Sequence, residues 1–164
     1  EQDYAQAAEW YQKAAAHDNI EAQYALGLWY HTGCYVEKNY ETSFSLFRKA
    51  AEKNDPRAQC ALGYCYDFGQ GTEIDHTHAF HWFKMSAEQG IAAAQYSLGM
   101  YYENGKGVER DHALAFSWYL KAAEQGNAEA QEALGRCYEN GIGVERNEAL
   151  AKEWFNKAKA SRSE

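Results

Sequence analysis

Apolar residues recur three or four positions apart along the whole chain, which is the pattern of helices with one buried face. In the clearest stretch, Ala94, Leu98 and Tyr102 share a face and Gly105 ends the helix. Asp111 then caps a second helix. The buried face of that helix carries Ala115, Trp118, Tyr119 and Ala122. The pattern therefore predicts a helical hairpin with a short glycine turn.

The same pattern returns every 36 residues without a gap. The motif Ala94-Gln95-x-x-Leu98-Gly99 has counterparts at residues 22–27, 58–63 and 130–135. Asp55-Pro56 is a strong start for one of these helices, since it joins a capping carboxylate to a proline in the first turn. A fixed period of this length predicts an all-α fold, a solenoid of stacked αα-hairpins. The expected organisation is the second helix of an incomplete repeat in 1–18, followed by repeats at 19–54, 55–90, 91–126 and 127–164.

One glycine recurs inside the first helix of each repeat, where glycine costs about 1 kcal/mol relative to alanine. The second helix has a small residue at one recurring position, for example Ser43 and Ala115. These positions predict that the two helices of a hairpin approach closely. We expect the larger Trp and Tyr/Phe positions to fill the space between adjacent hairpins. The glycines are Gly27, Gly63, Gly99 and Gly135.

The net charge of −8 argues against nucleic acid or an anionic membrane surface as the main partner. No apolar run reaches the roughly 18 residues of a membrane helix, and no signal peptide is visible at Glu1. The four cysteines do not recur as a pair in each repeat. We therefore expect free and mostly buried thiols, which favours a reducing compartment such as the cytoplasm.

Candidate chemistry is sparse. His76, His78 and His81 cluster near a helix start, but their spacing leaves a three-histidine metal site incomplete. The Gly-x-Gly turns, such as 105–107, follow helices rather than strands, so helix termination explains them better than phosphate binding. No nucleophile has a recognisable catalytic setting. We expect no catalytic residues, no metal and no cofactor.

The third repeat carries the pattern A-x-A-Q-x-x-L-G-x-x-Y-x-x-G-x-G-V-x-x-D-x-x-x-A-x-x-W-x-x-K-A-A-x-x-G almost throughout. It resembles the SEL-one-like repeat, a relative of the tetratricopeptide repeat, over essentially the whole chain. Tyr35 and Val36 stand where Gly107 and Val108 do, so the first turn departs from the pattern. The resemblance implies a right-handed αα superhelix that acts as an adaptor between proteins, without catalysis. The cysteine-rich branch of the family has a disulfide in each repeat, which this chain lacks.

In such a solenoid the first helices of the repeats line a concave face. Variable positions on this face are candidates for binding, because constant positions serve the architecture. The N-terminal repeats offer aromatic and apolar anchors, whereas the last repeat is charged. The predicted binding residues are Tyr24, Leu28, His31, Tyr64, Asp67, Tyr96, Met100, Glu103, Glu132, Arg136 and Glu139, with Cys60 at an equivalent position.

We therefore expect a protein or peptide partner, extended or helical, with a basic residue near the acidic groups. Two other functions stay open. The chain could be a structural spacer in a longer repeat protein, which predicts a bland polar concave face. It could be an enzyme, which would need convergent titratable groups in a pocket. The uncovered apolar face of the first helix, residues 3–17, would also allow self-association.

Overall fold

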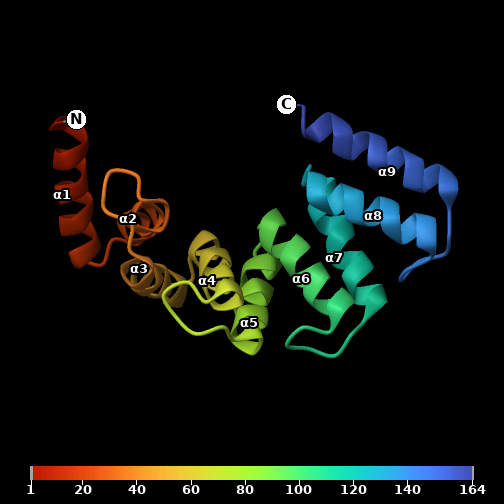
Figure 1. Cartoon of the computed structure of the whole chain (residues 1–164), viewed down its shortest axis with the longest axis horizontal. Helices are drawn as coiled ribbons and strands as arrows, with labels where there is room; N and C mark the ends of the chain where they lie inside the picture. Colours follow the sequence, from red (N-terminus) through yellow and green to blue (C-terminus); the bar gives the residue numbers. More distant parts are fainter. Residues whose placement is uncertain (1, 164) are drawn as a thin grey trace. The chain divides into compact units, whose positions relative to one another are not determined.

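The computed structural model describes the backbone of residues 2–163 and the side chains of residues 6–163. These residues form nine helices and no strand (Figure 1). The helices are α1 (Gln2–Ala16), α2 (Ile20–Thr32), α3 (Tyr40–Glu52), α4 (Pro56–Phe68), α5 (His76–Glu88), α6 (Ala92–Asn104), α7 (His112–Glu124), α8 (Ala128–Asn140) and α9 (Glu148–Ser161). The predicted all-α repeat fold is confirmed.

The helix ends follow the predicted capping chemistry. The Asp55 carboxylate accepts hydrogen bonds from the backbone N–H groups of Arg57 and Ala58, and Pro56 occupies the first turn. At the other end, Gly69 adopts the left-handed conformation that stops the helix. Helices α2, α6 and α8 end in the same way, at Gly33, Gly105 and Gly141.

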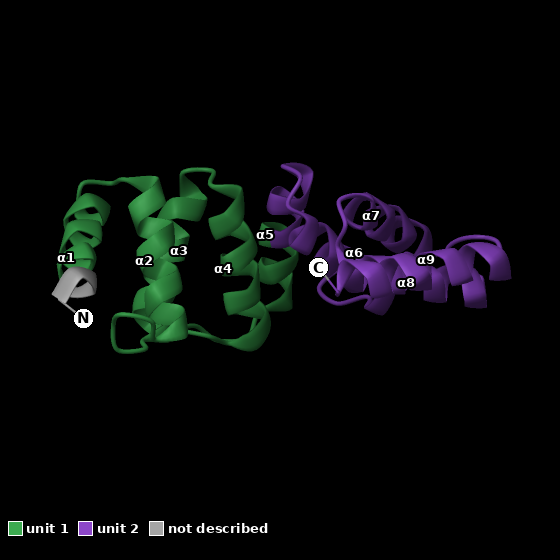
Figure 2. Ribbon diagram, turned by 90° about the horizontal axis from the view of Figure 1, so that it is seen from above, with its two compact units in different colours: residues 1–82 green, residues 83–164 purple. Residues whose placement is uncertain are grey.

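The helices form two compact units, residues 1–82 and residues 83–164, with the boundary inside α5 (Figure 2). Within each unit, helices pack mainly on their neighbours in sequence. The tightest pairs are the hairpins α2–α3, α6–α7 and α8–α9. The core of the first unit is built around the buried Phe47 and Leu62, and that of the second around Tyr119 and Leu134.

The recurring glycine lies under an aromatic ring of the second helix in the same hairpin. A methyl group at Gly27 would lie 2.7 Å from two ring carbons of Phe47. Gly99 and Gly135 face Tyr119 and Phe155 in the same manner. The expected close approach is confirmed. The Tyr/Phe rings pack against the next hairpin, as expected, and also against the glycine of their own hairpin, as the clusters around Phe47 and Tyr119 show. The missing Cβ leaves room for the ring inside the hairpin.

A buried glutamine joins each first helix to the preceding second helix. The side-chain amides of Gln23, Gln59, Gln95 and Gln131 each donate to a backbone carbonyl eight residues earlier, over 3.2–3.4 Å. These carbonyls lie in the last turn of a helix, where intrahelical partners run out. The glutamines are at most 5% exposed. This polar side chain therefore stabilises the stacking of one hairpin on the next.

The second glycine of each Gly-x-Gly turn also has a packing role. Gly71 has φ of +76°, and a methyl group there would overlap the carbonyl of Tyr40 at the start of α3. Gly143 approaches His112 at the start of α7 in the same way. Tyr35 replaces this glycine in the first turn and still adopts φ of +67°. A tyrosine in this conformation is strained, and its ring packs edge-on against Trp29.

Candidate functional site

The predicted binding residues lie on the first helices of the repeats, α2 and α4 in the first unit and α6 and α8 in the second. Most are half-buried, and none of the eleven belongs to the fully buried core. Cys60, at the equivalent position of α4, is 7% exposed and offers little surface. The two units each bring part of the set to their surface.

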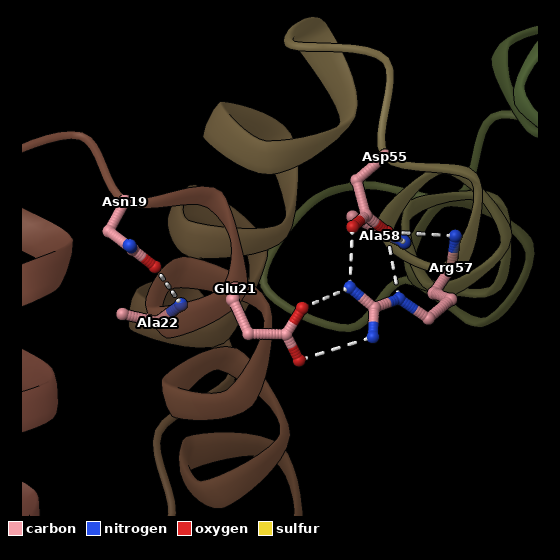
Figure 3. Close-up of polar contacts among 6 residues, drawn as sticks. All are labelled: Asn19, Glu21, Ala22, Asp55, Arg57 and Ala58. Carbon is pink, nitrogen blue, oxygen red and sulfur yellow. Dashed lines mark hydrogen bonds and ion pairs between the residues drawn. The ribbon is translucent and has the colours of Figure 1, made fainter.

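A charged cluster of Glu21, Asp55 and Arg57 lies beside Tyr24 in the first unit. Figure 3 shows the polar contacts within this cluster. The guanidinium of Arg57 stacks over the Tyr24 ring at 4.6 Å. The same group donates two hydrogen bonds to the Glu21 carboxylate, at 3.2 and 2.6 Å. It also bonds Asp55, at 3.3 and 2.7 Å. Tyr24 therefore presents its surface as part of a tyrosine–arginine pair, which the sequence pattern did not indicate.

The charges of this cluster reinforce one another. Burial alone would raise the pKa of Asp55, but the bonds from Arg57 and the N–H of Ala58 outweigh it and the pKa is lowered. Hydrogen bonds from Arg57 likewise lower the pKa of Glu21. Bonds to Asp55 and then Glu21 raise the pKa of Arg57. All three groups are ionised near neutral pH, so the cluster joins α2 to the start of α4.

Leu28 and His31 are next on α2. Leu28 is 37% exposed and available to a partner. His31 packs edge-on against the ring of Tyr40 at 5.3 Å. Burial, and then the charge of Lys38, lower the pKa of His31, so the imidazole is neutral near pH 7. Its buried Nδ1 atom has no hydrogen-bond partner in the described structure.

On α4, the Tyr64 ring stacks on Phe68, with centroids 6.2 Å apart and planes 10° apart. Phe68 is 62% exposed, although it was not among the predicted residues. Asp67 is nearly buried, and its carboxylate lies 3.3 Å from Nδ1 of His76. Asp67 is therefore already engaged within the fold, whereas Tyr64 and Phe68 form an aromatic surface.

In the second unit, Tyr96 packs on Tyr119, with ring centroids 5.7 Å apart. The Tyr119 hydroxyl donates a 2.5 Å hydrogen bond to Glu103. Burial, and then this bond, raise the pKa of Tyr119, so its hydroxyl keeps its proton. Met100 is half-buried against the same core. Glu103 therefore stabilises the α6–α7 hairpin through this hydrogen bond, and it is also partly exposed at the surface of α6.

Two of the three charged residues predicted on α8 form ion pairs, and the third does not. Glu132 lies 3.5 Å from Arg136 and forms a close ion pair with Arg162. Glu139 makes no hydrogen bond or ion pair with the described residues, and it lines a shallow hollow of about 300 Å³ beside Phe155 and Lys152. Glu139 is thus the unengaged carboxylate among the predicted acidic residues.

The histidine cluster is occupied by local contacts. His78 Nδ1 lies 2.7 Å from the Asp75 carboxylate, and its ring stacks on Tyr66 at 5.1 Å. His76 neighbours Asp67, as described above. Among the side chains of residues 6–163, no group of three or more His, Cys, Asp or Glu is placed to hold a metal ion.

None of the four cysteines forms a disulfide in the described part of the chain. Cys60, Cys65 and Cys137 are buried, and Cys34 is exposed. Burial raises the pKa of Cys65 to about 12 and that of Cys137 to about 11. Both thiols are protonated near neutral pH and are poor nucleophiles.

No described helix combines the length and apolar character required to span a bilayer. No protein of curated function matches the chain. A solved structure of c5321, a protective antigen of uropathogenic Escherichia coli with an SLR fold, is similar at 41% identity and a TM-score of 0.92. The alignment covers 96% of this chain and 34% of the antigen, so this chain spans about a third of that protein.

Two further structures show the same relationship. A Sel1 repeat protein of Oxalobacter formigenes has 34% identity and a TM-score of 0.89, over 96% of this chain and 65% of its own. Cysteine-rich protein B of Helicobacter pylori has 28% identity and a TM-score of 0.59, over 74% of this chain and 92% of its own.

The described residues thus form a helical repeat array like those of proteins with a Sel1 or SLR fold. Sel1 repeats are typically non-catalytic scaffolds that mediate protein–protein interactions. The Sel1 repeat model matches residues 1–19, 20–55, 56–91, 92–127 and 128–161. The chain belongs to the Sel1 repeat family.

Proposed function

We propose that the chain binds a protein or peptide segment through the exposed faces of its first helices. The observation that carries this proposal is the surface of α2 and α4, where Leu28 and the Tyr64–Phe68 pair present apolar groups to solvent. Aromatic and apolar side chains of this kind are the usual anchors of protein interfaces. A structural spacer would have no need of them.

The second unit would contribute a different chemistry to the same function. Tyr96 and Met100 are half-buried anchors on α6, and Glu139 on α8 has a carboxylate with no partner among the described residues. An unengaged carboxylate favours a lysine or arginine of the partner. We therefore propose that the bound segment combines apolar anchors with at least one basic residue.

The test is a pull-down from native lysate with the chain and with a Tyr64→Ala/Met100→Ala variant. We expect a protein that the parent chain retains and the variant loses. A control is Trp10→Ala/Leu114→Ala, which also truncates one aromatic and one aliphatic side chain, but on α1 and α7, the helices that stand second in their repeats. Circular dichroism must show that all variants stay folded.

Equal retention by the parent chain and the Tyr64→Ala/Met100→Ala variant would contradict the proposed surface. Loss of the partner with the Trp10→Ala/Leu114→Ala control alone would move the site to the second helices. Retention of no protein by any form would favour the spacer function.

A further inference from the structure

The repeats provide their own comparison, because equivalent positions share one backbone geometry. At the last position of the first helix, three repeats have a polar residue that bonds the carbonyl four residues earlier. Thr32 donates to Leu28 at 2.9 Å, Asn104 to Met100 at 2.8 Å, and Asn140 to Arg136 at 3.0 Å. The second repeat has Phe68 here, which cannot make this bond.

A second departure lies six residues further along the same turn. The other repeats have the cations Lys38, Arg110 and Arg146 at this position. The second repeat has Ile74, which is 60% exposed. Two large apolar side chains therefore stand exposed where the architecture accepts polar and charged ones.

Both departures lie near the C-terminal end of α4. Phe68 stacks on Tyr64, as described above, and Ile74 lies against Gly69, since a methyl group there would come within 2.9 Å of Ile74 Cγ1. We name Tyr64, Phe68 and Ile74 the repeat-2 patch. Single exposed apolar residues are common on protein surfaces, whereas exposed apolar side chains gathered at one place are candidates for an interaction site.

The surroundings of the repeat-2 patch are acidic. No lysine or arginine occurs between Arg57 and Lys84, whereas Glu73 and Asp75 flank Ile74 in the turn. Glu73 is exposed and makes no hydrogen bond or ion pair with the described residues. Residues 1–82 contain twelve acidic and six basic residues, so most of the net charge of the chain lies in this unit.

We infer that the repeat-2 patch docks a polypeptide segment in which an aromatic or aliphatic side chain stands beside a lysine or arginine. The apolar side chain packs against Phe68 and Ile74, and the cation pairs with Glu73. A second copy of this chain is a poor occupant, because it brings the same acidic surface and like charges repel. The inference rests on the proposed binding of a protein segment and assigns its main contact.

The test uses a phage-displayed library of random linear peptides, selected on the parent chain. Selected peptides are then measured by fluorescence anisotropy against a Phe68→Asn/Ile74→Arg variant. Both substitutions copy the third repeat, so the variant is designed to fold. The control, Asn104→Ala/Arg110→Ala, alters the equivalent positions of the third repeat.

We expect enrichment of peptides with an apolar residue next to Lys or Arg. Their Kd should rise at least about tenfold with the Phe68→Asn/Ile74→Arg variant and stay unchanged with the control. Replacing the basic residue of the peptide by Glu should weaken binding to the parent chain as well.

Three results would overturn the inference. Peptides that keep their Kd with Phe68→Asn/Ile74→Arg but lose binding with Tyr96→Ala/Met100→Ala would leave the proposed function intact and place its site elsewhere. Absence of enriched peptides would count against both. A fall in Tm of more than about 5 °C in the Phe68→Asn/Ile74→Arg variant would show that these side chains stabilise the fold.

Discussion

The ring of Phe47 packs directly on the backbone of Gly27, in the space where any other residue would have its Cβ atom. Alanine normally favours a helix over glycine by about 1 kcal/mol. At Gly27 we expect the opposite, because overpacking costs about 1–3 kcal/mol. Gly27→Ala should therefore lower the free energy of unfolding, measured by urea denaturation.

A double-mutant cycle with Phe47→Leu separates this clash from other effects of the substitution. The smaller side chain should accommodate the added methyl group, so the two changes should couple favourably by at least about 0.5 kcal/mol. An increase in stability for Gly27→Ala alone would mean that the ring moves aside freely.

Gly143 and Gly126 offer a matched pair in the second unit. Both have positive φ, +69° and +87°, but a methyl group at Gly143 would overlap the His112 carbonyl, whereas nothing lies within 4 Å at Gly126. We expect Gly126→Ala to cost about 1 kcal/mol for the left-handed conformation alone. Gly143→Ala should cost about 3 kcal/mol or more, because two backbone segments must separate. Equal losses in thermal or urea unfolding would show that the turn does not pack against α7.

The buried Oε1 atom of Gln23 lacks a hydrogen bond that its counterparts in the second unit accept, so a substitution that supplies a donor should stabilise the fold. In the second unit, the Oε1 atoms of Gln95 and Gln131 accept hydrogen bonds from Gln125 and Ser161, each 30 residues later. The equivalent residue in the first unit is Lys53, which bonds Asp18 instead, and Oε1 of Gln23 is buried without a partner.

Lys53→Gln should supply the missing donor. A net hydrogen bond contributes about 1 kcal/mol, and the exposed Lys53–Asp18 ion pair that is lost contributes less. We expect a gain of about 0.5 kcal/mol in the free energy of unfolding. Lys53→Ala is the control, because it removes the ion pair without adding a donor. A loss of stability in Lys53→Gln equal to that of the control would contradict the prediction.

The Asp55–Arg57 contact should make stability depend on pH in the acid range. The pKa of Asp55 is lowered in the fold from its ordinary value of 3.8. The ionised carboxylate thus stabilises the fold fully above that ordinary value, and this contribution is lost as pH falls through the lower, folded-state pKa. Asp55→Asn keeps a capping oxygen but removes the charge.

We expect Asp55→Asn to cost about 1–2 kcal/mol at pH 7, reduced by the partial exposure of Arg57. The difference from the parent chain should shrink as urea unfolding is repeated at pH values below about 4. A difference that stays constant down to pH 3 would mean that the charge of Asp55 contributes nothing.

The sequence predicted the helices and their ends because each signal is local and repeated. Asp55-Pro56 and the glycine stops need only a few neighbouring residues to act. The partner of Gly27 was harder to predict, because the Phe47 ring, 20 residues later, could fit inside the hairpin or between hairpins equally well by periodicity. The buried glutamine, in contrast, recurs at one position of each first helix, but the pattern of apolar positions does not indicate its backbone partner in the preceding helix.

The surroundings of the predicted binding residues could be predicted only in part. Leu28 is exposed and Tyr64 is half-buried, because their positions on the first helices follow from helix geometry. Arg57 stacks on Tyr24 from the following repeat. The positions equivalent to Arg57 are Glu21, Ala93 and Glu129, none of which is a cation, so the repeat pattern does not predict this contact. Phe68 and Ile74, in contrast, can be recognised in the sequence, because the other repeats have polar or charged residues at the equivalent positions.

The glutamine link also bears on how such genes change length. Each link joins residues eight apart, across the junction of two repeats. Removal of residues 92–127 would place Gln131 eight positions after Ala87, which now accepts from Gln95. Loss or duplication of one whole unit of coding sequence therefore recreates the same contact at the new junction, whereas a deletion that changes the eight-residue spacing at a junction removes it.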